Sequence, residues 1–463
     1  MTRPADVDVV VLGAGPAGLA AAWRAAERGR SVLVLERAPA VGGMAASFEV
    51  AGVRVDHGSH RLHPATPPEV LGPLRELLGE DLQTRPRHGR LRLYGRWVGF
   101  PLRAAELART LPPAALGRIG RDALTRPFVR RDDSSYAALL GSTLGPELYA
   151  ALYGPYALKL WGLPGDAIDP EQARRRVGAG GVWGIAGRIL RADRRGRGRV
   201  FHYPRRGFGQ IADALAGAAE KAGAAVQTGA EVASVRPGAG RVEVSTADGR
   251  TAGAGHVLST LPLPVLARLA GAAGPAVPGA GLRFRAMVLV YLVHTGGRWT
   301  GYDAHYLPGP ETPVTRLSEP ANYRDSPDDP TDRTVLCAEI PCAVGDPVWT
   351  STPDKLAALV LAGIAAAGLP PVELAGVEVR RLPHVYPVYE TGYARRLAGL
   401  DSWVDGLDRV TSFGRLGLFA HDNTHHAVAE AFDAVGALRP DGTRDPQRWA
   451  AARARFAGHV VED

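Results

Sequence analysis

Cysteine, lysine and long apolar runs are scarce in this chain of 463 residues. Its two cysteines, Cys337 and Cys342, are too few for a disulfide framework and lack the partners of a zinc site. We therefore expect the protein to work in a reducing, cytoplasmic compartment. No stretch is long enough to span a bilayer, so we expect no integral membrane segment. The apolar residues 9–23 do not resemble a signal peptide, because Asp6 and Asp8 precede them where positive charge is required.

Lysine is so rare that arginine supplies almost all of the positive charge. The formal net charge is +8, and the only lysines are Lys159, Lys221 and Lys355. Arginine together with abundant alanine and glycine is typical of a G+C-rich genome, which accounts for most of the excess. The densest arginine cluster, between Arg174 and Arg206, suits phosphate groups or a membrane surface. It lacks interleaved aromatic residues and any known nucleic-acid module, so we expect no nucleic-acid partner.

A dinucleotide-binding pattern occupies residues 7–36. Residues 9–12 predict a buried strand, Gly13, Gly15 and Gly18 complete a GxGxxG loop, and Pro16 suits the first turn of a helix. The helix N-terminus offers free N–H groups and its dipole to a pyrophosphate. A second strand ends at Glu36, where a carboxylate can accept the hydroxyl groups of an adenosine ribose.

Two later blocks continue the same α/β pattern. Residues 203–235 predict a loop, a helix over 208–222 and strands at 224–227 and 231–235. A hairpin and a buried strand at 256–262 follow, and residues 412–438 predict a strand, a loop and a helix that begins near Thr424. Between these blocks, residues 66–195 are predicted to be mostly helical, with a loop at 191–199. Residues 284–294 and 334–341 are predicted strands of another sheet.

The three blocks, with Gly42 and Gly43 after the second strand, resemble the flavoproteins related to UDP-galactopyranose mutase, protoporphyrinogen oxidase and phytoene desaturase. The mutase-like branch is the nearer one, on the segments 41–64, 153–177, 305–323, 386–393 and 414–419. The resemblance covers nearly the whole chain. It implies an α/β fold in which a discontinuous Rossmann-like FAD-binding domain carries an inserted α+β substrate domain.

The expected domain boundaries follow from this resemblance. The FAD-binding domain takes residues 1–65, 200–265 and 401–463, and the substrate domain takes a mostly helical part, 66–199, and a sheet part, 266–400. No residue for covalent attachment is evident, so we expect FAD to be held noncovalently. The predicted FAD-binding residues are Gly13, Gly15, Gly18, Glu36, Arg37, Gly42, Gly43, Met44, His60, Gly414, Arg415, Asn423 and Thr424.

Residues for catalysis and substrate binding are also implied by the resemblance. Arg415 of the GR pair is expected to tune the flavin, and His60, His421 and His425 are candidates if a proton moves with the hydride. The expected substrate-binding residues are Lys159, Trp161, Arg175, Arg176 and Arg316, with arginine forks suited to a diphosphate. His57, His60 and His63 are spaced by three, but Gly58 and Pro64 oppose a helix that would align them, so we expect no metal.

One departure from the mutase pattern bears on the reaction. Phe419 and His421 stand where the mutase has tyrosines that hold a sugar diphosphate. We therefore predict an FAD-dependent oxidase or dehydrogenase that oxidises a small molecule, sugar-like or glycosylated, by hydride transfer to flavin N5. The alternative is a non-redox mutase that acts on a nucleotide sugar through reduced flavin. The electron acceptor and the oligomeric state stay open.

Overall fold

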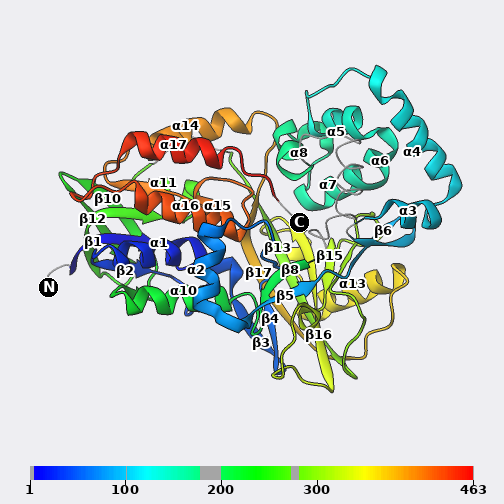
Figure 1. Ribbon diagram of the computed structural model, residues 1–463, viewed down its shortest axis with the longest axis horizontal. Helices are drawn as coiled ribbons and strands as arrows, with labels where there is room; N and C mark the ends of the chain where they lie inside the picture. Colours follow the sequence, from blue (N-terminus) through cyan, green and yellow to red (C-terminus); the bar gives the residue numbers. More distant parts are fainter. Residues whose placement is uncertain (1–4, 101, 178–199, 273–280, 462–463) are drawn as a thin grey trace.

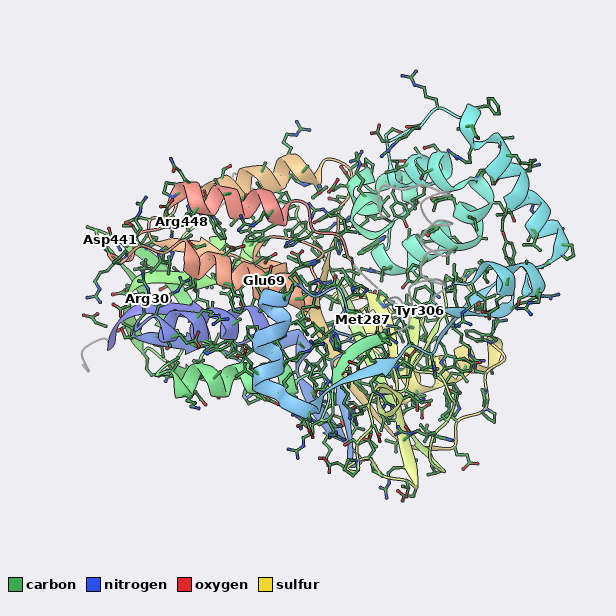
Figure 2. All side chains as sticks on the ribbon, in the orientation of Figure 1. Arg30, Glu69, Met287, Tyr306, Asp441 and Arg448 are labelled. Atoms are coloured by element: carbon green, nitrogen blue, oxygen red, sulfur yellow. The ribbon has the colours of Figure 1, made fainter. Side chains whose placement is uncertain are left out.

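Two seven-stranded sheets organise the described residues, one at the left of Figure 1 and one from its centre toward the lower right, with a lobe of helices at the upper right. The structure is a computed structural model that describes residues 5–100, 102–177, 200–272 and 281–461. Side chains fill both units, with Arg30 and Asp441 at the outer end of the first and Met287 and Tyr306 within the second (Figure 2). No helix of the described ranges is long and apolar enough to cross a membrane.

The first sheet joins strands from three distant parts of the chain. Its order is β10-β11-β12-β1-β2-β9, and β18 pairs with β12. β1 pairs in parallel with β2 on one side and with β12 on the other. The bounds are β1 Ala5–Leu12, β2 Val32–Leu35, β9 Ala225–Gln227, β10 Val232–Gly238, β11 Arg241–Thr246, β12 Thr251–Ser259 and β18 Val410–Ser412. The predicted discontinuous Rossmann-like sheet is confirmed.

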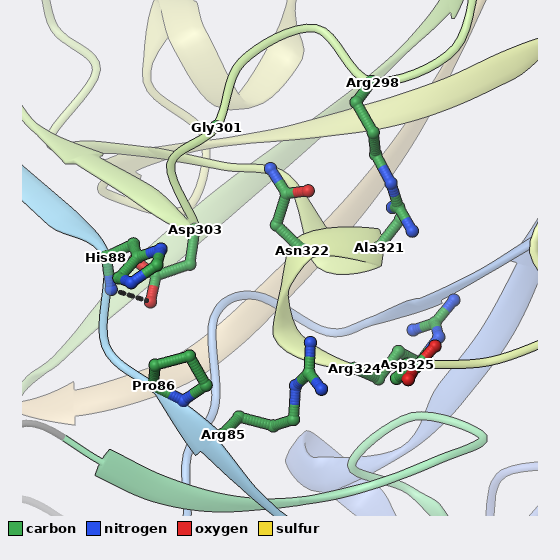
Figure 3. A pocket seen from close by; sticks show the side chains of 10 residues that line it. All are labelled: Arg85, Pro86, His88, Arg298, Gly301, Asp303, Ala321, Asn322, Arg324 and Asp325. Carbon is green, nitrogen blue, oxygen red and sulfur yellow. Dashed lines mark hydrogen bonds between the residues drawn. The ribbon is translucent and has the colours of Figure 1, made fainter.

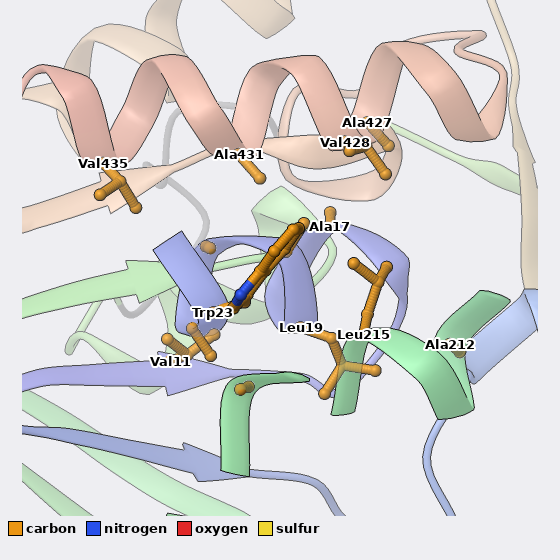
Figure 4. Packing of buried hydrophobic residues seen from close by; sticks show 14 of the residues in the cluster. Val11, Ala17, Leu19, Trp23, Ala212, Leu215, Ala427, Val428, Ala431 and Val435 are labelled. Atoms are coloured by element: carbon orange, nitrogen blue, oxygen red, sulfur yellow. The ribbon is translucent and has the colours of Figure 1, made fainter. Parts of the chain in front are cut away.

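Helix α1 (Pro16–Glu27) lies between two other helices on one face of this sheet (Figure 4). α10 (Gln210–Lys221) and α16 (Thr424–Gly436) pack against it. Trp23 faces α16, where Val428 and Val435 lie, and Leu19 faces Leu215 of α10 (Figure 4). Small residues along α1 permit this close packing on both sides. The opposite face is covered by α11 (Leu263–Leu269) and α14 (Tyr393–Asp405), while α2 (Pro68–Leu78) and α17 (Pro446–Phe456) complete the unit.

The second sheet has the order β17-β13-β16-β15-β14-β6-β7. Strand β13 (Phe284–Thr295), which pairs with β17 and with β16, is buried on both faces, and apolar residues occupy both of its alternating sets. Val288 and Val290 face α13 (Pro353–Ala366), whereas Met287 and Tyr291 face the β3–β4 hairpin. The remaining bounds are β3 Ser47–Val50, β4 Val53–Asp56, β6 Gly89–Leu93, β7 Arg96–Phe100, β14 Ala304–Tyr306, β15 Arg316–Ser318, β16 Arg333–Cys342, α12 Pro347–Thr350 and β17 Leu374–Pro387.

The expectation that residues 66–195 are mostly helical is wrong for residues 82–100. β5 (Leu82–Pro86) pairs with β8 (Val200–Pro204), and β6 and β7 extend the second sheet. The alternation in GRLRL has the period of a strand with one buried face, and that signal was available in the sequence. The helical lobe that follows comprises α3 Ala104–Thr110, α4 Pro113–Thr125, α5 Tyr136–Leu144, α6 Pro146–Leu148, α7 Gly154–Trp161 and α8 Pro170–Val177. The predicted loop at 191–199 lies outside the described residues.

Candidate functional site

The glycines of the first loop are required by contact distances. Gly13 has φ +97°, a conformation that side chains disfavour, and a Cβ placed on Gly18 would lie 1.9 Å from the Gly13 carbonyl oxygen. Gly15 is the N-cap of α1 and makes no side-chain cap. The first N–H groups of α1 therefore keep their capacity to bind an anion.

A second loop closes on the first. The Gly42 N–H donates to the Ala14 carbonyl oxygen at 2.7 Å. A Cβ on Gly43 would lie 3.4 Å from the Gly15 Cα, and one on Gly42 would lie 2.8 Å from the Ala46 Cβ. Both glycines also have positive φ. The backbone of residues 42–43 thus passes directly beside the phosphate loop. Met44 follows in the 3₁₀ turn Gly43–Ala45.

Glu36 is held by backbone donors on both sides. Its Oε2 accepts the Ala14 N–H at 2.8 Å, and its Oε1 accepts the Ala38 N–H at 2.9 Å. Each carboxylate oxygen keeps a second lone pair for a ribose hydroxyl group. The carboxylate is therefore positioned by the loop that would hold the pyrophosphate. Arg37 is exposed next to it.

The third segment reaches the same place from the far end of the chain. Gly414 has φ +80°, and a Cβ there would lie 3.3 Å from the Cβ of Ala17 in the first turn of α1. Arg415, in α15 (Gly414–Gly417), donates to the Val385 carbonyl oxygen at 3.1 Å and to the Asp422 carbonyl oxygen at 2.7 Å. These bonds orient the guanidinium group of Arg415.

Helix α16 begins one turn after this segment. Asn423 is its N-cap in a capping box with His426, and Thr424 is its first residue. The positive end of α16 is thereby placed beside the GR pair. Three segments with glycines at contact distance converge on the N-terminus of α1, and this cradle fits a dinucleotide such as FAD. The roles of the single residues in it stay predictions.

The three histidines of residues 57–63 do not converge on one point. His57 Nδ1 lies 3.3 Å from the Gly43 carbonyl oxygen, and His63 Nδ1 accepts the Ala65 N–H. His60 stacks on Phe208 with ring centroids 5.2 Å apart. Burial lowers the pKa of His60 below its ordinary value, so its imidazole is neutral near pH 7.

Aromatic side chains from three elements gather beside Arg415. Trp161 meets His421 edge-on with ring centroids 5.1 Å apart, and Tyr389 meets His421 at 4.8 Å. The Arg415 guanidinium carbon lies 5.2 Å from the Tyr386 ring centroid. We call Trp161, Tyr386, Tyr389 and His421 the aromatic wall. The sequence suggested Trp161 and His421, whereas the two tyrosines were visible only as part of the segment YPVYETGY.

Phe419 does not belong to this wall. Its side chain is fully buried between Phe284, Tyr389 and Tyr393. It also has φ +52°, a sterically costly conformation for a side chain that large. The turn at Phe419 brings His421 and Asp422 back toward Arg415. Phe419, which stands where the mutase has a tyrosine, therefore points into the core.

The cations expected to bind a diphosphate have protein partners instead. The Lys159 ammonium donates to the carbonyl oxygens of Leu307, Gly309 and Val314, which uses all three of its hydrogens. Burial lowers the pKa of Lys159 to about 8. The lysine thus stabilises the loop 307–314, and the structure gives its role as a substrate ligand no support.

Arg316 and Arg175 are engaged in the same way. Arg316 donates two bonds to the Glu339 carboxylate, at 2.8 and 2.9 Å, and this ion pair is buried. Arg175 donates to Glu171 at 2.7 Å and to the His459 carbonyl oxygen at 3.1 Å, which ties α8 to the C-terminal segment. The side chain of Arg176 lies outside the described ones. Arg175 and Arg316 are therefore engaged by protein partners, and diphosphate binding by an arginine pair stays a prediction.

A buried charged cluster that the sequence did not indicate lies beneath the GR pair. His459 Nδ1 lies 3.0 Å from Asp422 Oδ1 and 3.6 Å from Glu430 Oε1. Glu430 also accepts the Gly414 N–H at 2.8 Å. Burial raises the pKa of Glu430 to about 8, and the two carboxylates raise the pKa of His459 to about 9 against the desolvation that opposes them. The C-terminal segment thereby stabilises the conformation of the GR segment.

Asp422, His426 and His459 also bring three possible metal-ligand atoms within 4.8 Å of one another. However, the rings of His426 and His459 stack with centroids 4.1 Å apart and an angle of 13°. Two nearly parallel imidazoles direct their nitrogen lone pairs into separate planes, so they cannot bind one ion in this arrangement. His425 is buried beside His426 in the first turn of α16.

A polar cavity of about 310 Å³ opens elsewhere, on the second unit (Figure 3). Arg85, Arg298 and Arg324 line it, and Asp303 accepts the His88 N–H at 3.1 Å at its edge (Figure 3). The Arg324 side chain is held by Asp329. None of the lining residues belongs to the three segments that meet at the N-terminus of α1, residues 13–18, 42–44 and 414–415, so this cavity is separate from the cradle.

Residues 16–380 match the family described as flavin containing amine oxidoreductase. The chain belongs to this family. It is an FAD-dependent flavoprotein, and the cradle around α1 is where such a cofactor fits. The predicted membership of the amine-oxidase superfamily is confirmed.

Known structures share the fold over nearly the whole chain. A reduced UDP-galactopyranose mutase matches with a TM-score of 0.79 and 20% identity, covering 99% of this chain and 100% of that one. A protein from Exiguobacterium described as a protoporphyrinogen oxidase matches with a TM-score of 0.71 and 19% identity, covering 94% of this chain and 99% of that one. A putrescine oxidase solved with putrescine has a TM-score of 0.66, 18% identity, and coverage of 93% and 98%.

Sequence similarity to curated proteins is shorter. AofH of Mycobacterium tuberculosis, named as a flavin-containing monoamine oxidase, is 40% identical over 113 residues. That match covers 24% of this chain and 23% of AofH. The flavoprotein therefore spans about a quarter of the length of this relative.

Proposed function

We propose that this flavoprotein oxidises a small organic molecule by net hydride transfer to FAD, with the substrate seated against the aromatic wall. The wall adjoins Arg415 of α15, the segment that meets the N-terminus of α1. Flat aromatic faces suit an apolar or sugar-like body, and they exclude water from the reacting carbon. FAD, when bound, supplies N5 as the hydride acceptor.

One observation favours oxidation over isomerisation. Lys159 and Arg316 are bound by buried protein acceptors, and Arg175 is bound by Glu171 and the C-terminal segment. A mutase must retain a diphosphate leaving group during the reaction, and paired cations are the usual means. Withdrawing these cations from their present partners would leave buried carbonyl and carboxylate oxygens unsatisfied. Oxidation needs only a carbon positioned near the cofactor.

The chain's own residues have separable tasks in this proposal. Arg415 and the N-terminus of α16 supply positive charge where a reduced flavin becomes anionic. His60, neutral because burial lowers its pKa, is the candidate proton acceptor if a proton leaves with the hydride. His421 is a member of the wall whose ring nitrogens could hydrogen-bond a substrate hydroxyl or amine.

The test is anaerobic mixing of the oxidised, FAD-loaded protein with candidate substrates. Primary amines, polyamines, sugars and glycosides form the panel, because amine oxidation and the mutase-like fold both occur among the structural relatives. Bleaching of the flavin absorbance by one substrate class, with one oxidised product per reduced flavin, would support the proposal. The Trp161→Ala variant should raise the KM for that substrate with FAD still bound.

A second candidate function rests on the mutase fold, which matches 99% of the chain with a TM-score of 0.79. Pre-reduced protein under strict anaerobic conditions would be offered nucleotide sugars, including UDP-galactopyranose. Multiple turnovers to a furanose isomer, with the flavin still reduced at the end, would replace oxidation by isomerisation.

A further inference from the structure

The end of α4 and the turn after it lie at the outer edge of the helical lobe (Figure 1). Three large apolar side chains are exposed there. Within the described residues, Phe128 is 90% exposed, Leu124 is 77% exposed and Val129 is 48% exposed. We call Leu124, Phe128 and Val129 the apolar tip. Single exposed apolar residues are common on proteins, but here three lie within six positions, at the end of α4 and in the turn that follows.

Hydrogen bonds hold the apolar tip in a defined conformation. The Val129 N–H donates to the Arg126 carbonyl oxygen at 3.0 Å, and the Arg126 guanidinium group donates to the Gly141 carbonyl oxygen at 3.0 Å. On the other side, the Asp132 N–H donates to the Ser142 hydroxyl group at 3.0 Å. The turn is therefore anchored to α5 at both ends and presents Phe128 outward.

Basic residues surround the apolar tip. Arg121, Arg130 and Arg131 are exposed beside it. Arg118, one turn back, is already paired with Glu147 at 2.8 Å. The acidic residues that follow are Asp132, whose carboxylate accepts the Ser134 N–H, and Asp133, which pairs with Arg174 at 3.1 Å. The solvent-facing side of the turn therefore combines apolar groups with three exposed arginines. The carboxylates of Asp122, which lies 3.8 Å from Arg121, and of Asp132 offset part of their charge.

We propose that the apolar tip docks on an anionic lipid surface, with Phe128 and Leu124 entering the headgroup region and the arginines contacting lipid phosphates. Apolar side chains with flanking basic residues are what such a surface recognises, and long arginine side chains reach phosphate while their stems stay in apolar surroundings. Docking of a second protein at the apolar tip, including a second copy of this chain, is the alternative that the experiment distinguishes.

The experiment is sedimentation of the full-length, FAD-loaded protein with large vesicles. One set contains phosphatidylcholine alone, and the other contains equal parts of phosphatidylcholine and phosphatidylglycerol. We expect sedimentation with the anionic vesicles only, weakened by salt. Phe128→Ser combined with Leu124→Ser should reduce the vesicle affinity about tenfold or more, and so should Arg130→Gln combined with Arg131→Gln.

Matched controls use exposed positions far from the turn. Val344, 61% exposed, is changed to Ser, and Arg236 of β10 is changed to Gln. Both controls should bind vesicles like the parent protein, and bound FAD and the melting temperature verify that every variant is folded. Failure of the parent protein to bind either vesicle would overturn the proposal. Equal binding by the Phe128 and Leu124 variant would do the same, as would a dimer in light scattering that this variant dissolves.

Discussion

Removing the Glu36 carboxylate tests the cradle most directly. In the folded protein this carboxylate accepts the Ala14 N–H at 2.8 Å and the Ala38 N–H at 2.9 Å. Glu36→Ala therefore removes the predicted ribose ligand and also the anchor that connects the phosphate loop to the end of β2. The β1, α1 and β2 core remains buried, so we expect the variant to fold.

The expected loss follows from the kind of bond removed. A hydrogen bond to a charged group contributes about 1.5–3 kcal/mol, which corresponds to roughly a ten- to hundredfold weaker FAD affinity. Glu36→Gln is the more specific variant, because it changes only one of the two carboxylate oxygens. Its amide keeps one acceptor oxygen but turns the other oxygen into an N–H donor that faces a backbone N–H. We expect its FAD affinity to fall between those of the parent and of Glu36→Ala.

Flavin fluorescence measures the affinity, because FAD released into solution is more fluorescent than bound FAD. Apoprotein is titrated with FAD for the parent, both Glu36 variants and Glu27→Ala, an exposed carboxylate at the end of α1 that pairs only with Arg24 on the surface. The control should match the parent. Glu36→Ala with an FAD affinity within twofold of the parent would show that the carboxylate does not hold the ribose.

Three further outcomes are expected. Gly18→Ala should yield colourless protein, because its methyl group would lie 1.9 Å from the Gly13 carbonyl oxygen, and retention of FAD on purification would contradict this contact. Arg415→Ala should lower the flavin midpoint potential by about 30 mV or more, equivalent to about 1.4 kcal/mol for two electrons, and an unchanged redox titration would remove Arg415 from the flavin. Because the folded pKa values of Glu430, about 8, and of His459, about 9, are both raised, folding favours their protonated forms, so stability should fall as pH rises from 5 to 9. Glu430→Gln should flatten the decline below pH 8, by roughly a few degrees in melting temperature, and a parallel decline in both proteins would refute it.

Much of the fold could be predicted because its signals are local. Residues 9–12 and 32–35 are continuous apolar strands, and the helix between them begins at Pro16 as expected. The helix predicted over 208–222 is observed as Gln210–Lys221. The strands at 82–100 were not predicted, although the alternation in GRLRL is a local strand signal. The strands that pair with β5 and with the inner edge of β6, β8 and β14, lie more than a hundred residues further along the chain, and no local pattern indicates them.

The candidate site likewise combines features that the sequence determined with features that only the tertiary structure decided. The sequence by itself determined the phosphate loop, the Glu36 position and the GR pair. These features depend on residues close together in the chain, so the spacing of the glycines and the acid at the end of a strand are enough to indicate them. Only the tertiary structure decided the partners of Lys159 and Arg316, because a carbonyl or a carboxylate far along the chain competes for each cation. The aromatic wall and the Asp422, Glu430 and His459 cluster arise in the same way. Their members come from separate segments of the chain. Folding buries these members against each other, and this burial determines both their contacts and their protonation, which no local sequence pattern indicates.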